Sequence, residues 1–368
     1  MVRILVDARC VRSGRTGVGY YTEEILRVLD DLTGTDEIAA LNLTPEEWVP
    51  PLKNIRVLPT VMDYESHPMG ELWENIILPR ITRQGGYDVF WGPAFLIPWV
   101  KISALKAATI HDMMAFMMPH CYSKLFAAYM RFVIRRALHT SDMIVCDSAC
   151  VAADIARAFP RLKRPVHVVH PGVSDFFHAA DDSQVDKDAI CELPAILVIG
   201  AGNPLKNTAF AERISKRLRQ DGIAHRFIVV GNHEGPPKAD HIEHVSWQTR
   251  ADMRRLYQTS TLFMMPSLYE GFGMPALEAM ACGCPVAAAR SGSLPEVGGA
   301  AALYFNLDNE TDCARVIAGL LRSPERLARM RKDGFARAAE FSWHDSARRL
   351  LDLFHSHVAA KTTGQAES

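Results

Sequence analysis

Short apolar runs alternate with longer amphipathic segments along this chain. The runs cover residues 3–6, 107–110, 143–146, 195–199, 226–230, 262–265 and 286–289. Runs of this length, ended by glycine, proline or polar residues, are typical of buried strands in a parallel sheet. The segments between them place apolar residues at helical spacing, as Tyr21, Ile25 and Leu29 do in the first one. The alternation predicts an α/β fold.

Weaker patterns complete the expected order of elements. They predict strands at 87–93, 166–169 and 302–305, and helices at 18–32, 121–139, 250–258, 310–321 and 325–340. Ser342 and Asp345 form a capping box that starts a final helix. The polar, acidic stretch 174–188 separates two groups of strands. With 368 residues we expect two domains, at 1–174 and 189–341.

Composition narrows the class of protein. Hydrophobic residues make up 48% of the chain, and the net charge of −1 gives no basic field for nucleic acid. Neither a signal peptide nor a transmembrane run is visible. We read the eight cysteines as buried thiols of a cytoplasmic protein, because their spacing fits no zinc site and Cys282-Gly283-Cys284 is too short for one.

The stretch 262–296 is the most informative. A buried strand leads into the turn Glu270-Gly271-Phe272-Gly273, and Pro275 stands where a helix begins. A glycine turn before a helix start is an anion site, since backbone N–H groups and the helix dipole face the ligand. Glu270 and Glu278 flank it and can accept hydrogen bonds from hydroxyls. We therefore expect a ligand with phosphates and sugars; the alternative is a tight strand–helix turn with solvated carboxylates.

The string Ser267-Leu-Tyr-Glu-Gly-Phe-Gly-Met-Pro275, with seven residues between Glu270 and Glu278, resembles retaining glycosyltransferases of family 4 (group 1), mannosyltransferase-like members included. The resemblance implies the GT-B fold, two Rossmann-like domains facing a central cleft, with a final helix at about 342–358 crossing back to the first domain. It implies that the second domain binds a nucleoside diphosphate sugar and that the first supplies the acceptor side.

The same resemblance assigns roles to the residues of this stretch. Glu278 would hold the ribose hydroxyls and Glu270 the hydroxyls of the transferred sugar. The residues whose backbone N–H groups would cradle the diphosphate are Gly271, Phe272, Gly273 and Met274.

A second loop, 200–207, ends in Pro204-Leu205-Lys206-Asn207 and resembles the family's G-x-x-x-P-R-K-N. Lys206 and Asn207 match, and Lys206 would neutralise the diphosphate. Leu205 replaces the usual arginine, so a second cation is missing there; Arg9 and Arg15 are candidates to supply it. Val245 stands where the family's nucleobase pocket usually lies.

The N-terminal loop Thr16-Gly17-Val18-Gly19-Tyr20 is similar to the family's T-G-I-G-R loop. The resemblance places Gly17 and Gly19 against the donor phosphate, although Tyr20 replaces the arginine and a plain strand–helix turn is the alternative. No dinucleotide fingerprint G-x-G-x-x-G is present.

His111 and Asp112 follow the strand at 107–110, as Asp147 and Ser148 follow the strand at 143–146. Ile110-His111-Asp112 resembles the family's I-H-D segment, in which the histidine contacts the donor sugar or its phosphate. We expect His111 to donate a hydrogen bond to the leaving group and Asp112 to support it. A structural histidine is the alternative. Trp91 would line the acceptor cleft or pack in the core.

The resemblance implies a retaining hexosyltransferase that uses GDP-mannose, with UDP-sugars as the next choice, and a glycan, lipid-linked or small glycosyl acceptor. We expect no nucleophile, no cofactor and no metal, and we reject Asp186-Lys187-Asp188 as a metal motif because it lies in a charged linker. A sugar-nucleotide epimerase or hydrolase and a non-catalytic sugar-nucleotide-binding protein remain alternatives. The oligomeric state stays open.

The segment 121–139 interleaves Lys124, Arg131, Arg135 and Arg136 with apolar residues. It fits peripheral contact with anionic lipid at the inner face of the membrane. It also fits a surface helix whose apolar face packs on the sheet, and we favour this second interpretation.

Overall fold

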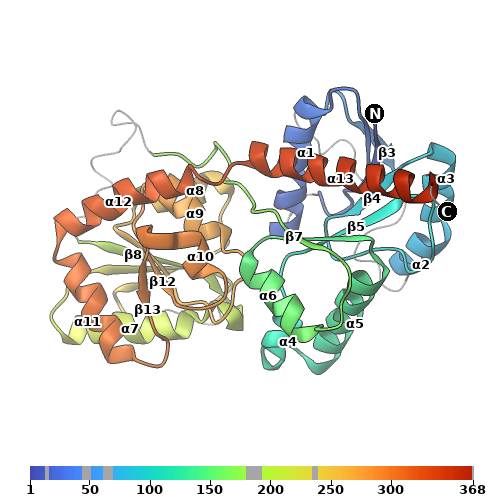
Figure 1. The fold of residues 1–368 in the computed structure, drawn as a ribbon. Helices are drawn as coiled ribbons and strands as arrows, with labels where there is room; N and C mark the ends of the chain where they lie inside the picture. Colours follow the sequence, from blue (N-terminus) through green and yellow to red (C-terminus); the bar gives the residue numbers. More distant parts are fainter. Residues whose placement is uncertain (13–15, 44–50, 61–68, 180–192, 234–238, 367–368) are drawn as a thin grey trace. The chain divides into compact units, whose positions relative to one another are not determined.

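The chain folds into two compact units in the computed structural model, which describes residues 1–368 except 13–15, 44–50, 61–68, 180–192, 234–238 and 367–368 (Figure 1). Unit 1 comprises Met1–Gly172 and Ser342–Ser368, and unit 2 comprises Val173–Phe341. The acidic Asp186-Lys187-Asp188 segment and Arg15 lie outside the described residues.

Unit 1 is built on a seven-stranded sheet in the order β3-β2-β1-β4-β5-β6-β7, and every pairing is parallel. Its strands are β1 (Arg3–Asp7), β2 (Glu37–Asn42), β3 (Arg56–Pro59), β4 (Val89–Gly92), β5 (Leu105–Ile110), β6 (Met143–Cys146) and β7 (Val166–Val168). Its helices are α1 (Gly17–Leu32), α2 (Met69–Ile76), α3 (Leu78–Gly85), α4 (Met114–Met117), α5 (Lys124–Thr140), α6 (Ala149–Ala158) and α13 (Trp343–Ala366).

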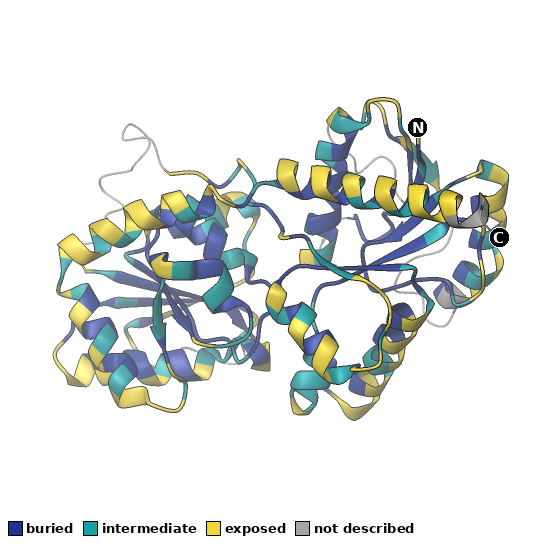
Figure 2. Ribbon diagram, in the orientation of Figure 1, coloured by how far each residue is buried: buried dark blue, intermediate teal, exposed yellow. Residues whose placement is uncertain are grey.

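The inner strands of the unit 1 sheet, such as β4 and β6, are buried on both faces, which explains why they are apolar, whereas the edge strands β3 and β7 are only partly buried. One face packs against α3, α5 and α6, where Phe90, Ile110 and Ile144 meet Ile134 and Ile155. Figure 2 shows the strands as buried and the outer sides of the helices as exposed.

Helix α13 belongs to unit 1 although it ends the chain. It packs beside α1 (Figure 1), and the ring of Trp343 lies 5.6 Å from that of Tyr21. The Ser342 hydroxyl accepts from the N–H groups of His344 and Asp345, as the capping pattern predicts. Helix α13 continues to Ala366, beyond the end expected at about residue 358, and Lys361 Nζ donates to the Ser103 carbonyl at 3.2 Å.

Unit 2 is built on a six-stranded parallel sheet in the order β10-β9-β8-β11-β12-β13. Its strands are β8 (Ala195–Ala201), β9 (Arg226–Gly231), β10 (Ile242–Val245), β11 (Leu262–Met265), β12 (Val286–Ala289) and β13 (Leu303–Phe305). Its helices are α7 (Thr208–Gln220), α8 (Arg250–Thr259), α9 (Met274–Ala281), α10 (Leu294–Gly298), α11 (Glu310–Leu321) and α12 (Pro324–Ala338).

Alternate residues of each strand in unit 2 serve two separate cores. Ile196 and Val198 point to the α7 and α11 side, whereas Leu197 points to the α8 and α9 side. Because parallel strands share one direction, the loops that follow β8 and β11 emerge at the same edge of the sheet. These are the two loops that we predicted to bind the donor, the loop 200–207 after β8 and the turn at Glu270 after β11.

No helix among the described residues combines the length and the apolarity needed to cross a bilayer.

Candidate active site

Lys206 and Glu270 form an ion pair at the carboxyl edge of the unit 2 sheet. Lys206 Nζ lies 2.7 Å from Glu270 Oε1. Lys206 follows β8 and Glu270 follows β11, and these two strands are neighbours. Glu270 is buried, and the Lys206 side chain keeps 24% of its surface exposed. The sheet therefore joins residues that are 64 positions apart in the sequence.

The conformation of Gly200 leaves the space that the Lys206 side chain fills. Gly200 has φ of +106°, and a Cβ built there would lie 2.3 Å from Lys206 Cγ. No residue with a side chain fits this position without displacing Lys206. Asn207 has the left-handed conformation, with φ of +50°, and occupies the N-cap position of α7 without a side-chain capping hydrogen bond.

The Glu270 loop is held by the segment that follows β12. Ser293 Oγ lies 3.0 Å from the carbonyl oxygen of Glu270 and 2.7 Å from that of Phe272, which share its one hydroxyl proton, and the Ser293 N–H donates to the Glu270 carbonyl at 3.1 Å. Beside it, a Cβ on Gly292 would lie 2.5 Å from the Glu270 carbonyl oxygen. The backbone of Gly292 therefore packs directly against that of Glu270 and fixes the position of the Glu270 backbone, from which the carboxylate extends.

The same loop is tied to the lysine loop and to the start of α9. The Leu268 N–H donates to the Leu205 carbonyl at 2.8 Å. Gly273 is the N-cap of α9, offers no side chain to the first helical N–H groups, and no acidic residue lies in the first turn. The start of α9 thus keeps the positive end of its dipole beside Glu270.

Glu278 lies on α9 and accepts a hydrogen bond from the Tyr257 hydroxyl at 3.2 Å. Burial, together with the charge of Glu278, raises the pKa of Tyr257 well above its usual value. Tyr257 therefore stays a neutral donor that orients one carboxylate oxygen. Sequence reasoning missed Tyr257, because only the packing of α8 on α9 brings it close.

Leu205, the departure from the family motif, is a core residue with 2% of its surface exposed. Its backbone carbonyl accepts the hydrogen bond from Leu268 in the Glu270 loop. Val245 ends β10 and is half-buried, and Trp247 after it is 56% exposed.

His111 belongs to unit 1, whereas the residues described above belong to unit 2. It follows β5 and is buried, with Nδ1 2.7 Å from Asp147 Oδ2 and Nε2 2.6 Å from the Pro93 carbonyl oxygen. A carbonyl and a carboxylate only accept hydrogen bonds, so this setting favours the imidazolium form, in which both ring nitrogens donate. Burial opposes this charge, but Asp147 and the Pro93 carbonyl outweigh it and raise the pKa of His111.

This arrangement changes what was expected of His111. Its two N–H groups are already donated within unit 1, so its hydrogen bond to a leaving group stays a prediction that requires one of them to be released. Asp112 accepts from the Met114 N–H at 2.9 Å and thereby starts α4. Trp91 is fully buried and donates to Thr109 Oγ1, so it packs.

The N-terminal loop is partly outside the described residues. Gly17 begins α1, Thr16 precedes it without a side-chain cap, and Gly19 is buried. A Cβ on Gly17 would meet no atom within 4 Å. The phosphate contact of Gly17 and Gly19 stays a prediction.

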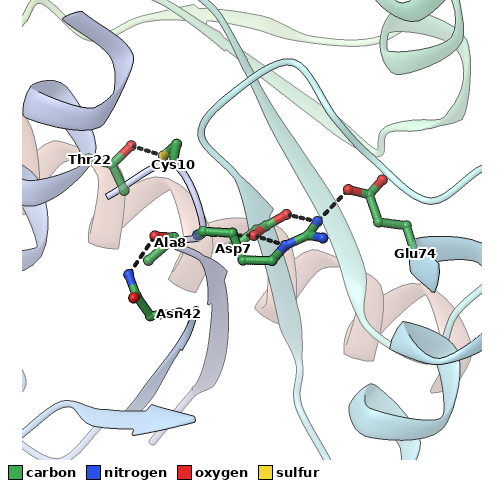
Figure 3. A network of polar contacts seen from close by, with 7 residues as sticks. Asp7, Ala8, Cys10, Thr22, Asn42 and Glu74 are labelled. Carbon is green, nitrogen blue, oxygen red and sulfur yellow. Dashed lines mark hydrogen bonds and ion pairs between the residues drawn. The ribbon is translucent and has the colours of Figure 1, made fainter. Parts of the chain in front are cut away.

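The expectation that Arg9 supplies the missing cation is wrong. Its guanidinium is fully buried and paired with Asp7 Oδ2 at 2.6 Å and with Glu74 on α2 (Figure 3). The indole of Trp73 covers it at 4.8 Å. Burial opposes the charge, but the two carboxylates together raise the pKa of Arg9 further above its usual value. Arg9 therefore ties β1 to α2.

No group of three or more histidine, cysteine, aspartate or glutamate side chains suited to a metal occurs within the described part of the chain. Cys282 and Cys284 are buried, and burial raises the pKa of both thiols, that of Cys282 to about 12. They are packing residues.

Models of two glycosyltransferase domains match the chain. The model of glycosyltransferase family 4 matches residues 16–175, and that of glycosyl transferases group 1 matches residues 194–323. The chain belongs to glycosyltransferase family 4. The expected family is thus confirmed, and the two models fall one on each unit.

Curated relatives are similar to this family 4 chain at modest identity. An MMP alpha-(1->4)-mannosyltransferase from Mycolicibacterium hassiacum is 29% identical over 238 residues, which are 61% of this chain and 56% of the relative. O-antigen chain mannosyltransferase B from Escherichia coli is 25% identical over 78% of this chain and 77% of its own length. A D-inositol 3-phosphate glycosyltransferase from Mycobacterium avium is 32% identical over 54% of this chain and 51% of the relative. The chain thus aligns with about half the length of two of these three.

Solved structures share the fold. Sucrose-phosphate synthase from Thermosynechococcus elongatus has a TM-score of 0.76 at 16% identity, over 98% of this chain and all of that one. Anabaena HepE in complex with UDP-glucose has a TM-score of 0.74 at 14% identity, over 97% of this chain and all of that one. The predicted α/β GT-B fold is confirmed.

Proposed function

We propose that this family 4 chain transfers a hexose from a nucleoside diphosphate sugar to a glycan, lipid-linked or small glycosyl acceptor, with retention of configuration and without a metal. The observation that carries the proposal is the Lys206–Glu270 pair beside the uncapped start of α9. A cation and a helix N-terminus complement a diphosphate, and a fixed carboxylate complements sugar hydroxyls.

In this proposal Lys206 and the N–H groups of Gly271 to Met274 stabilise the departing diphosphate. Glu270 holds the hydroxyls of the transferred sugar, and Glu278, oriented by Tyr257, holds those of the ribose. The bond between the anomeric carbon and the diphosphate oxygen breaks, and the acceptor oxygen bonds to the same face of that carbon. The acceptor's proton passes to the leaving phosphate, and no residue acts as nucleophile.

Mannose is the favoured sugar, because two of the relatives are named mannosyltransferases. GDP-mannose is therefore the first donor to test. UDP-sugars come second, since a protein with the same fold was solved with UDP-glucose.

The first test is a thermal-shift panel of GDP, UDP, ADP and their sugars. A ligand at 100-fold its Kd should stabilise the protein by about 2.7 kcal/mol. Stabilisation by GDP and GDP-mannose alone supports the favoured donor, and stabilisation by UDP compounds moves the proposal to a UDP-sugar. If none of them shifts the melting temperature, the donor site is wrong.

The second test separates transfer from binding. We expect Glu270→Gln and Lys206→Met to lose about 10²–10³-fold in kcat. Glu243→Gln, which removes the exposed Arg226–Glu243 pair of the same unit, serves as the matched control. If the parent protein binds the donor but neither releases nor transfers sugar, it is a non-catalytic binding protein. Leu205 supports this alternative, because it is buried where the family usually has an arginine.

A further inference from the structure

Helix α5 leaves large apolar side chains exposed on its outward side. Leu125 is 86% exposed, Phe126 46% and Phe132 42%. The inward side packs on the sheet, as we expected of a surface helix. Its buried residues are Ala127, Val133, Ile134, Ala137 and Leu138. Figure 2 marks the outward side of this helix as exposed. The burial of one face therefore leaves the apolar residues of the other unexplained.

The loop before β5 extends this apolar area. The ring of Trp99 lies 5.3 Å from that of Phe132, and Val100 is 40% exposed. The N–H of Trp99 donates to Asn75 Oδ1 at 2.7 Å, which fixes the loop to α2. We call the exposed residues Leu125, Phe126, Phe132 and Val100, together with the half-buried Trp99, the α5 surface.

The charged residues in the two segments that carry the α5 surface are all basic. Residues 89–111 and 113–141 contain no aspartate or glutamate. Lys101, Lys124, Arg135 and Arg136 are exposed there. The guanidinium of Arg136 lies 5.1 Å from the Trp99 ring and 5.9 Å from the Phe132 ring. Cations stacked on exposed aromatic rings can keep their charge at a headgroup while the rings enter the apolar layer.

We propose that the α5 surface docks unit 1 on an anionic lipid bilayer. The charge favours a negative partner, and the apolar side chains favour one with an accessible hydrocarbon layer; an anionic membrane surface offers both. Helix α5 has 17 residues and a buried inner face, so it lies on the membrane and does not cross it. The docking does not depend on the donor proposed above.

The experiment is cosedimentation of the full chain with vesicles. Vesicles of phosphatidylcholine with about 30% phosphatidylglycerol bind the parent protein, and vesicles of phosphatidylcholine alone bind it at least tenfold more weakly. Raising the salt concentration weakens the binding, since exposed charges are screened.

Two variants test the two components separately. Leu125→Ser with Phe126→Ser lowers the partition coefficient about tenfold or more, because apolar area no longer enters the bilayer. Arg135→Gln with Arg136→Gln lowers it roughly fivefold for each cation removed. The matched controls lie in unit 2: Leu193→Ser with Phe335→Ser for apolar exposure, and Arg326→Gln with Arg329→Gln for charge.

The proposal fails if the parent does not bind anionic vesicles, or if the α5 variants bind as the parent and controls do. Sedimentation velocity without lipid tests the alternative that a second copy of the chain binds the α5 surface. A parent dimer that Leu125→Ser with Phe126→Ser dissociates would assign the α5 surface to a second copy of the chain and overturn the membrane proposal. All variants are compared at equal folded fraction by circular dichroism.

Discussion

Asp147 Oδ2 lies 2.7 Å from His111 Nδ1, and the two residues follow the paired positions Cys146 and Ile110 of adjacent strands. A carboxylate at this place fixes the imidazole ring and its charge. The ring of Tyr21 packs edge-on against the ring of His111, with 4.7 Å between the two ring centroids. Asp147 is thus a positioning residue for the histidine that the family motif singles out.

Asp147→Asn should lower the pKa of His111. The pKa of His111 is higher in the folded protein than in the unfolded chain, where it is about 6.5, so protonation of His111 stabilises the fold. This contribution is complete below the unfolded pKa and is lost as the pH rises through the folded pKa. The variant should therefore lose stability mainly at acidic pH. Imidazole NMR titration measures the pKa, and thermal unfolding against pH measures the stability. Asp112→Asn is the control; a drop as large as that of Asp147→Asn would contradict the assigned pair.

Gly200→Ala should reduce donor turnover without removing a charge. The added methyl group would lie 2.3 Å from Lys206 Cγ and displace the lysine, so we expect kcat/KM to fall at least tenfold. Gly222→Ala is the matched control, because Gly222 also has a positive φ, +77°, but a Cβ there meets no atom within 4 Å. Equal losses in both variants would attribute the effect to backbone strain alone.

Ser293→Ala should affect both stability and transfer. It removes the hydroxyl proton that the carbonyls of Glu270 and Phe272 share and leaves these carbonyls less satisfied, at a cost of about 1–3 kcal/mol. Ser215→Ala is a fair comparison, since Ser215 is equally buried in unit 2 but bonds His225 and His241. Both variants should melt earlier, and Ser293→Ala alone should lose kcat. Unchanged kcat would show that the loop holds Glu270 without Ser293.

Glu74→Gln should destabilise unit 1 by about 3–5 kcal/mol, because one carboxylate of the buried Arg9 cluster loses its charge. The loss should appear as an earlier thermal transition. Glu37→Gln, which breaks the exposed pair with Arg3, should cost less than about 1 kcal/mol. Similar small losses in both variants would mean that Asp7 alone balances Arg9.

Most strands that are buried on both faces were predictable, because a continuous apolar run marks them. Strands β2, β3 and β10 were not predicted, and β2 was missed although it is buried from Ile38 onward. β3 lies at the sheet edge and reads Arg56-Val57-Leu58-Pro59, with exposed ends that break the apolar pattern. Edge strands bury less, so their sequence carries less of the signal.

The site residues were predictable one by one, but their partners were not. Lys206 and Glu270 stand in recognisable motifs, whereas Asp147, Ser293 and Tyr257 contact site residues only through strand order and helix packing. Arg9 was misjudged for the same reason. Its partner Glu74 is 65 positions away, and nothing local to Arg9 shows that its charge is already balanced.

The membership of α13 in unit 1 also sets the order in which the protein is completed during synthesis. Unit 2 has its last residue at Phe341, whose carbonyl accepts from the N–H of Val173, the first residue of that unit, at 3.1 Å. Unit 1 still lacks Trp343 and Phe354 at that moment, and these side chains cover Tyr21 and Trp91. Unit 1 is therefore begun first and completed last. A ribosome that stops near residue 341 releases a chain that has all of unit 2 but lacks the part of unit 1 that covers Tyr21 and Trp91.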